Sequence, residues 1–236
     1  PGDSPNLGLE FAADPEVTAA PGLALVSYIA SGRGDKAPGG LVLHRLFEVN
    51  REAGSPWAPE MLPKEAVSGN AGQFVDKPFQ LLHLDPPGSG TVPVSSTLKD
   101  GSPITQDVPA GRLFIAYTTF LKNKSKLNVA YSDNYGETWS TTKLSETQAV
   151  NQSASLAAHG DNVCAVWRRF QWRRQGDAIL ISCSNNRGKR WSRSRVIAEG
   201  PEFDPFDQGT TETTFRTNSY PVLASDGATF YAFWTT

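Results

Sequence analysis

Cysteine is scarce in this chain of 236 residues, and Cys164 and Cys183 have neither zinc-site spacing nor the CxxC spacing of a redox motif. Two thiols are also too few for a disulfide framework. If the segments around 160–167 and 178–185 form a hairpin, the two cysteines face each other across it and can pair. Two buried free thiols are the alternative.

The chain also lacks an excess of charge of either sign, with 22 Lys and Arg against 24 Asp and Glu. A net charge of −2 creates no general field for nucleic acid or an anionic membrane, so charged recognition has to be local and nucleic acid is not an expected partner. No apolar run approaches the roughly 20 residues that span a bilayer, which predicts a soluble protein without a membrane span. The chain starts at Pro1 without a signal-peptide pattern, so we expect that a signal peptide, if one existed, was removed or lies outside this sequence.

Motifs for metals and cofactors are missing as well. His44, His83 and His159 are scattered, and none has the spacing of a metal ligand. The sequence contains no nucleophile elbow and no phosphate-binding loop. We therefore expect neither a bound metal nor another cofactor.

What the chain does contain is turn and strand formers. Its 21 glycines, 17 prolines and 10% aromatic residues suit many short strands joined by tight turns better than long helices. This composition predicts an all-β fold.

The sequence is also internally repetitive. A small residue or glycine is followed four times by alternating apolar residues that end in an aromatic residue, at 21–28, 111–117, 160–167 and 227–234. Each copy reads as a buried strand after a turn. A second apolar strand follows at 127–132 and at 178–184 and runs straight into a polar turn.

The two polar turns, at 132–139 and 184–191, share the pattern Ser-x-Asn-x-Gly-x-(Thr/Arg)-Trp with an offset of 52 residues. An asparagine side chain can cap its own turn, glycine can adopt the positive φ that closes it, and tryptophan can anchor the returning strand. The pattern therefore predicts a structural turn.

This turn resembles the Asp-box (BNR) motif of the sialidase-like β-propellers, with Asn in place of the usual Asp. A strand at 41–44 followed by Asn50, Gly54 and Trp57 is similar to a degenerate third copy. The resemblance implies a β-propeller of four-stranded antiparallel blades, with the innermost strands at 76–85, 151–160 and 218–227.

On this interpretation the chain is a single partial propeller domain of about three and a half blades. The blades are expected at 1–68, 69–148, 149–200 and, incompletely, 201–236. An open arc leaves apolar faces and strand edges uncovered, so we expect a fragment of a six-bladed ring.

Function is expected at the end of the blades opposite the Asp boxes, where three features meet. The first is the basic loop 168–177, in which Arg168, Arg169 and Arg173 can bind carboxylates and Trp172 can stack on a sugar. A solvated hairpin tip is the alternative.

The second feature is the acidic loop 198–216. Glycoside hydrolysis needs two carboxyl groups beside a sugar, and Asp204, Asp207 and Glu212 are the catalytic candidates. An exposed acidic loop without catalytic function is the alternative.

The third feature comprises polar residues where the inner strands begin, with Lys77, Asn151 and Asn218 expected at equivalent positions. The candidate ligand-binding residues are Asp76, Lys77, Asn151, Gln152, Arg216 and Asn218. Residues that cap strands and hydrate the channel are the alternative.

Phe215-Arg216 retains the first half of the Phe/Tyr-Arg-Ile-Pro motif of family sialidases. The resemblance implies that Arg216 holds a substrate carboxylate and offers Tyr220 as a nucleophile candidate. The leading hypothesis is an extracellular or periplasmic, carbohydrate-active propeller that hydrolyses or binds an acidic glycan or polysaccharide, like an exo-α-sialidase. The alternative is a non-catalytic secreted repeat domain that binds another protein or polysaccharide, or serves as a scaffold.

Overall fold

The computed structural model describes residues 11–32, 39–47, 64–68, 74–97, 102–121, 124–146, 149–170, 176–200 and 220–235. Within these ranges the protein is all-β and has no helix, as the composition predicts. The strands form separate antiparallel sheets, and none of the sheets closes on itself. No described segment is a helix long and apolar enough to cross a membrane.

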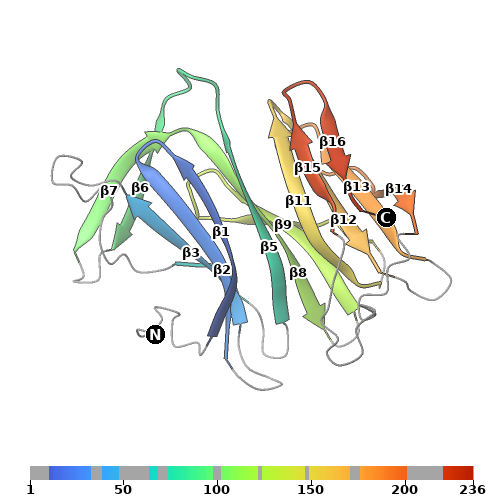
Figure 1. Ribbon diagram of the computed structural model, residues 1–236. Coiled ribbons are helices and arrows are strands. Elements are labelled where there is room, and N and C mark those ends of the chain that lie inside the picture. Colours follow the sequence, from blue (N-terminus) through green and yellow to red (C-terminus); the bar gives the residue numbers. More distant parts are fainter. Residues whose placement is uncertain are drawn as a thin grey trace.

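Three of the sheets have four strands each (Figure 1). The first contains β1 (Phe11–Ala20), β2 (Leu23–Ser31), β3 (Gly39–Phe47) and β4 (Lys64–Ser68). The second contains β5 (Phe74–Leu84), β8 (Gly111–Leu121), β9 (Lys124–Ser132) and β10 (Ser140–Lys143). The third contains β11 (Asn151–His159), β12 (Asn162–Arg169), β13 (Ala178–Ser184) and β14 (Arg195–Glu199).

Two two-stranded sheets complete the described fold. β15 (Val222–Ser225) pairs with β16 (Phe230–Phe233) after the third four-stranded sheet. β6 (Thr91–Thr97) and β7 (Pro103–Pro109) form a hairpin inserted between β5 and β8. The first strands β1, β5, β11 and β15 pack beside one another in that order.

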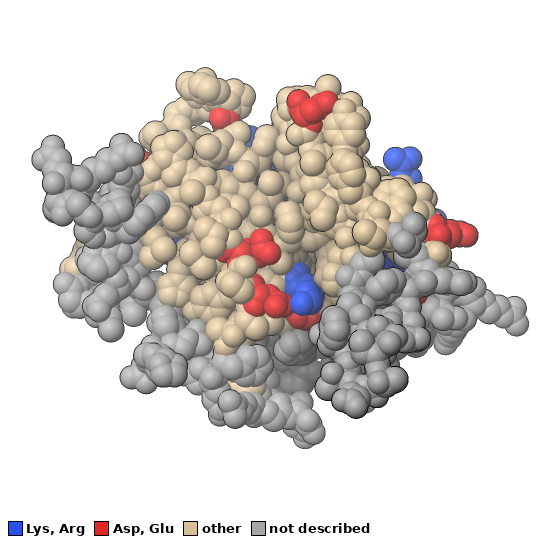
Figure 2. Space-filling model, in the orientation of Figure 1, with Lys and Arg blue, Asp and Glu red and all other residues tan. Residues whose placement is uncertain are grey.

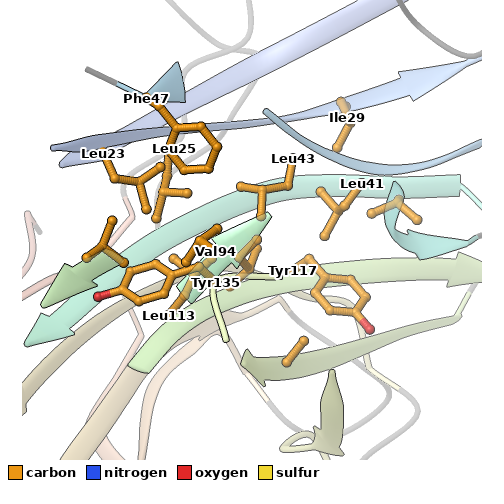
Figure 3. Packing of buried hydrophobic residues seen from close by; sticks show 14 residues of the cluster. Leu23, Leu25, Ile29, Leu41, Leu43, Phe47, Val94, Leu113, Tyr117 and Tyr135 are labelled. Atoms are coloured by element: carbon orange, nitrogen blue, oxygen red, sulfur yellow. The ribbon is translucent and has the colours of Figure 1, made fainter. Parts of the chain in front are cut away.

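Apolar side chains fill the space between successive sheets, because strands with both faces covered need apolar residues on both faces. Leu25 and Leu43 of the first sheet share a core cluster with Leu113 of the second (Figure 3). Ile115 belongs to the same cluster. Further along, Phe114 faces the third sheet. Leu223, Phe230 and Ala232 of the β15–β16 sheet pack on the third sheet's opposite face.

The inserted β6–β7 hairpin adds to the first of these cores. Val94 and Val108 are fully buried and lie in the cluster between the first and second sheets. The Gln106 side chain donates a hydrogen bond to the carbonyl oxygen of Gly22, which ties the hairpin to the β1–β2 turn. The sequence pattern gave no indication of this insertion.

The two turns with the Ser-x-Asn-x-Gly pattern join the third strand to the fourth, as expected. In the first, the Ser132 hydroxyl accepts hydrogen bonds from the N–H groups of Asn134 and Gly136, and the Asn134 side chain accepts one from the N–H of Thr138. The second turn repeats these bonds with Ser184, Asn186, Gly188 and Arg190. The asparagine cap is therefore confirmed, and the serine is a partner of equal importance.

The turn glycines adopt the expected positive φ, 97° at Gly136 and 79° at Gly188. They also pack closely, because a Cβ at Gly188 would lie 2.6 Å from Cε1 of Phe114 on the preceding sheet. Both tryptophans of the motif, Trp139 and Trp191, lie partly buried against the core. In the degenerate third copy, β3 covers the strand at 41–44, whereas Asn50, Gly54 and Trp57 lie outside the described residues.

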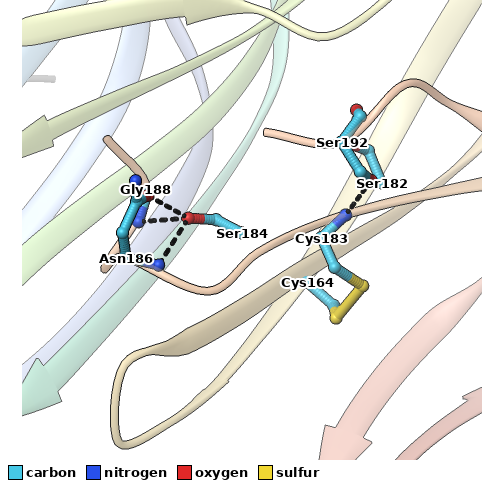
Figure 4. The surroundings of a disulfide bond; sticks show 7 residues. All are labelled: Cys164, Ser182, Cys183, Ser184, Asn186, Gly188 and Ser192. Atoms are coloured by element: carbon cyan, nitrogen blue, oxygen red, sulfur yellow. Dashed lines mark hydrogen bonds between the residues drawn. A yellow bond between two sulfur atoms is a disulfide. The ribbon is translucent and has the colours of Figure 1, made fainter. Parts of the chain in front are cut away.

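Cys164 and Cys183 form a disulfide, which decides between the two alternatives that the sequence left open (Figure 4). They are directly paired residues of β12 and β13, with Cα atoms 4.1 Å apart. The bond lies one residue before Ser184, so it fastens the ladder where the turn 184–191 begins.

Candidate functional site

The strands β1, β5 and β11 each carry a β-bulge near their first residues. The pairing skips two residues after Ala13, after Asp76 and after Gln152. The first skipped residue is left-handed each time, with φ of 51° at Asp14, 51° at Lys77 and 54° at Ser153. This conformation is uncommon for residues other than glycine, and bulges of this kind redirect side chains. The three adjacent strands β1, β5 and β11 therefore have the same kind of β-bulge at the same end of their sheets.

Two groups of polar side chains lie at this bulged end, and the backbone N–H of Lys77 links them into a polar network by donating to the Asp76 carboxylate. The Lys77 ammonium lies 3.6 Å from the Asp14 carboxylate, which joins β5 to β1. The Gln152 amide of β11 donates a hydrogen bond to the Asp76 carboxylate of β5. Tyr220, two residues before β15, donates from its hydroxyl to the Gln152 side-chain oxygen over 3.2 Å. These contacts connect β1 to β5, β5 to β11, and β11 to the residue two positions before β15.

Aromatic rings flank the network on the side of the third sheet. The ring of Phe170 contacts that of Tyr220 edge to face, with centroids 6.5 Å apart. The Arg168 guanidinium lies 4.5 Å above the Phe170 ring and forms an ion pair with Asp177. Phe170 and Tyr220 are both partly exposed, and Arg168 covers one face of the Phe170 ring.

Burial alters the carboxyl groups of this end. Burial raises the pKa of Asp76 above its ordinary value, while Lys77 and the Gln152 hydrogen bond oppose that rise. Burial also raises the pKa of Glu16, although its carboxylate accepts a hydrogen bond from the backbone N–H of Gln80. Figure 2 shows acidic and basic atoms gathered near the middle of the face that it presents.

The register differs from the one expected from the sequence. Lys77 and Ser153 are the left-handed residues of their bulges and therefore correspond to each other. Asn151 lies two residues before Ser153 and corresponds to Val75, because Asn151 pairs with Arg169 of β12 as Val75 pairs with Thr119 of β8. The expected equivalence of Lys77 with Asn151 was therefore wrong by two residues. The repeats were aligned on the strands that follow β5 and β11, and this alignment gave no sign of the bulges within β5 and β11.

Asn151 also has a different role from the one expected. Its side chain is buried, donates to the carbonyl oxygen of Ala149 and accepts a hydrogen bond from the Trp167 indole. Its backbone carbonyl accepts from Thr118 and Ser125. The strand-capping alternative therefore describes Asn151, whereas Asp76, Lys77 and Gln152 lie in the network.

The two described arginines of the basic loop are buried. Arg168 is 0% exposed and Arg169 is 8% exposed, and Arg169 donates to the carbonyl oxygen of Gly176. Neither guanidinium therefore lies on an open hairpin tip. Trp172 and Arg173 lie outside the described residues.

Most of the acidic loop also lies outside the described residues. This applies to the catalytic candidates Asp204, Asp207 and Glu212 and to the ligand-binding candidates Arg216 and Asn218. Of the expected catalytic residues, Tyr220 alone is described, and it belongs to the network.

Sequence reasoning missed Asp14, Glu16 and Phe170. A signal for the bulges was present, because the left-handed residues of β1 and β5 both precede proline, as Asp14-Pro15 and Lys77-Pro78. No group of three or more His, Cys, Asp or Glu residues within the described ranges is arranged to hold a metal ion.

Neither the comparison with protein-family models nor the one with curated proteins gives a match for this chain.

Proposed function

We propose that the chain forms part of an Asp-box β-propeller that binds a glycan at the bulged ends of its first strands. The observation that carries this proposal is the network in which Asp14, Asp76, Lys77, Gln152 and Tyr220 connect four neighbouring strands. Such convergence of polar groups from separate elements is typical of ligand sites.

The arrangement of the sheets supports the propeller. Each four-stranded sheet runs in order from its first strand to its fourth, apart from the inserted β6–β7 hairpin. Successive sheets share apolar cores face to face, and their first strands are neighbours. Radial repetition of blades produces this combination of contacts.

The chemistry of the network supports a sugar ligand. Carboxylates accept hydrogen bonds, an ammonium donates them, and an amide or a phenol can do both, so the network matches the mixed donors and acceptors of sugar hydroxyls. The rings of Phe170 and Tyr220 lie beside these groups and supply apolar surface for the C–H face of a pyranose.

Hydrolysis of the bound glycan is a second candidate, favoured by Asp76. A general acid must hold its proton near the working pH, and burial raises the pKa of this carboxyl. This hydrolase hypothesis is the one drawn from the sialidase-like resemblance. Release of a fluorophore from a panel of glycosides that includes a sialoside, with loss of turnover in Asp76→Asn, would support it.

Binding is tested by applying the purified protein and its Gln152→Ala variant to a glycan array. We expect the variant to lose most of its signal, because Gln152 links Asp76 to Tyr220. Gln106→Ala is the control, since it removes the same side chain and a glutamine hydrogen bond at the opposite end of the sheets. A silent array would leave the non-catalytic scaffold or protein-binding domain as the better hypothesis.

We further propose that the protein acts in an extracellular or periplasmic compartment. The Cys164–Cys183 disulfide supports this, because disulfides persist mainly in oxidising surroundings. Titration of free thiols in protein isolated without reductant tests it, and two reactive thiols would contradict it.

A further inference from the structure

We propose that the bulged end selects sugars that lack a carboxylate over acidic sugars such as sialic or uronic acids. This inference rests on the proposed glycan binding and specifies its ligand class. It departs from the acidic glycan that the sialidase-like resemblance implies.

The charges at the bulged end favour such a ligand. Asp14, Glu16 and Asp76 supply three carboxyl groups there, and Lys77 is the ammonium that faces Asp14. The charge of Asp14 also contributes to raising the pKa of Glu16 and of Asp76, so the three carboxyl groups repel one another. A sugar carboxylate brought to this end therefore approaches a surplus of like charge among the described residues.

The described arginines of the basic loop are poorly placed to hold a ligand carboxylate. Arg168 is fully buried and its guanidinium is paired with the Asp177 carboxylate. Arg169 is nearly as buried and donates to the Gly176 carbonyl oxygen. Burial therefore limits the access of a ligand carboxylate to these two side chains.

A buried acceptor lies further along the same strands, where the Gln80 amide donates to Thr18 and to the carbonyl oxygen of Leu25. Gln80 is 4% exposed, and its Oε1 accepts no hydrogen bond from any described residue. Its backbone N–H donates to the Glu16 carboxylate and its Nε2 donates to the Thr18 hydroxyl, so the amide lies between β1 and β5. This oxygen needs a donor, which a sugar hydroxyl, or a water held by it, supplies.

The test compares pairs of oligosaccharides that differ only by a carboxylate, such as a neutral glycan with its sialylated form and a hexose oligomer with its uronic-acid counterpart. Dissociation constants are measured by calorimetry at low and at high NaCl concentration. We expect the neutral member to bind at least about threefold more tightly at low salt, with the difference shrinking as salt screens the charges.

Charge variants identify the source of the discrimination. Asp14→Asn and Asp76→Asn should each narrow the difference between the paired ligands, whereas Asp161→Asn should leave it unchanged. Asp161 lies in the β11–β12 turn at the far end of β11, so this control removes the same charge from a distant position.

The possible outcomes separate the two proposals. If the acidic member binds as tightly as the neutral one or more tightly, the selectivity is refuted while glycan binding stands. If neither member of any pair binds, the proposed glycan binding fails, and this inference fails with it.

Discussion

At one end of the sheets, the turns 132–139 and 184–191 repeat the same serine and asparagine hydrogen bonds to backbone N–H groups, with Ser184 and Asn186 in the places of Ser132 and Asn134. At the bulged end, the repeated positions share only a left-handed backbone, and their side chains belong to Asp, Lys and Ser. Identical chemistry at equivalent positions indicates a structural requirement. Different side chains on a repeated backbone are free to serve recognition.

Substitution of a turn glycine is expected to cause the largest change in stability. Gly188→Ala places a Cβ 2.6 Å from the Phe114 ring at a φ of +79°, so we expect a loss of roughly 2–5 kcal/mol in the free energy of unfolding, measured with urea. Gly200→Ala is the control, because Gly200 also has a positive φ but no heavy atom lies within 4 Å of its Cβ position. It should lose only about 1–2 kcal/mol. Equal losses would show that packing against the preceding sheet is unimportant.

Removal of the disulfide should have the next largest effect. The double substitution Cys164→Ala and Cys183→Ala opens a loop with a sequence separation of 19. We expect it to lower stability by about 2–4 kcal/mol, because the unfolded chain regains conformational freedom. The check is thermal unfolding of both proteins with and without reductant. A variant as stable as the oxidised protein would contradict the bond's role in fastening this end.

A smaller loss is expected from the serine of the turn. Ser184→Ala leaves the N–H groups of Asn186 and Gly188 without their acceptor, which should cost about 1–3 kcal/mol in unfolding free energy. Ser95→Ala removes an exposed hydroxyl that bonds to Thr105 and should change stability by less than about 0.5 kcal/mol. Matching values in denaturant titrations would make the serine dispensable.

At the bulged end, Asp76→Asn should raise the free energy of unfolding slightly, whereas the substitutions above lower it. Because burial raises the pKa of Asp76, its ionised form destabilises the fold at neutral pH, and this penalty disappears as the pH falls below the ordinary carboxyl range. Asparagine can still accept the hydrogen bond from Gln152. We therefore expect a modest gain in unfolding free energy at pH 7 that shrinks as the pH falls and vanishes below about pH 3.

Asp107→Asn is the control for that comparison, since Asp107 is an exposed carboxylate on β7. It should change stability by less than about 0.5 kcal/mol. A loss of stability in Asp76→Asn at pH 7 would mean that the ionised carboxylate holds the bulged end together, and the contrast between the two ends would no longer stand.

The sequence predicted those parts of the fold that depend on local chemistry. The serine, asparagine and glycine of the turns act on their own neighbours, so the pattern at 132–139 and 184–191 was sufficient to place them. The apolar strands were equally visible, because burial on both faces leaves few alternatives to Val, Leu, Ile and aromatic residues. The all-β prediction followed from these features.

The site depends on pairing between strands and on contacts between sheets, which cannot be read from the sequence of a single strand. The bulge at Lys77 is defined against Thr118 and Ala116 of the partner strand, so counting along one strand misplaced Asn151. Asp14 and Glu16 become neighbours of Lys77 and Gln80 only when two sheets pack together. The inserted hairpin escaped notice for the same reason, since its core residues serve a neighbouring sheet.

That hairpin has a consequence for the order of folding. β6 and β7 pair through a short local connection, whereas β5 must find β8 across the whole insertion. Local pairs close faster because less chain entropy is lost. We expect the hairpin to form early and to shorten the effective separation of β5 from β8, so that the second sheet assembles around an insert that is already folded.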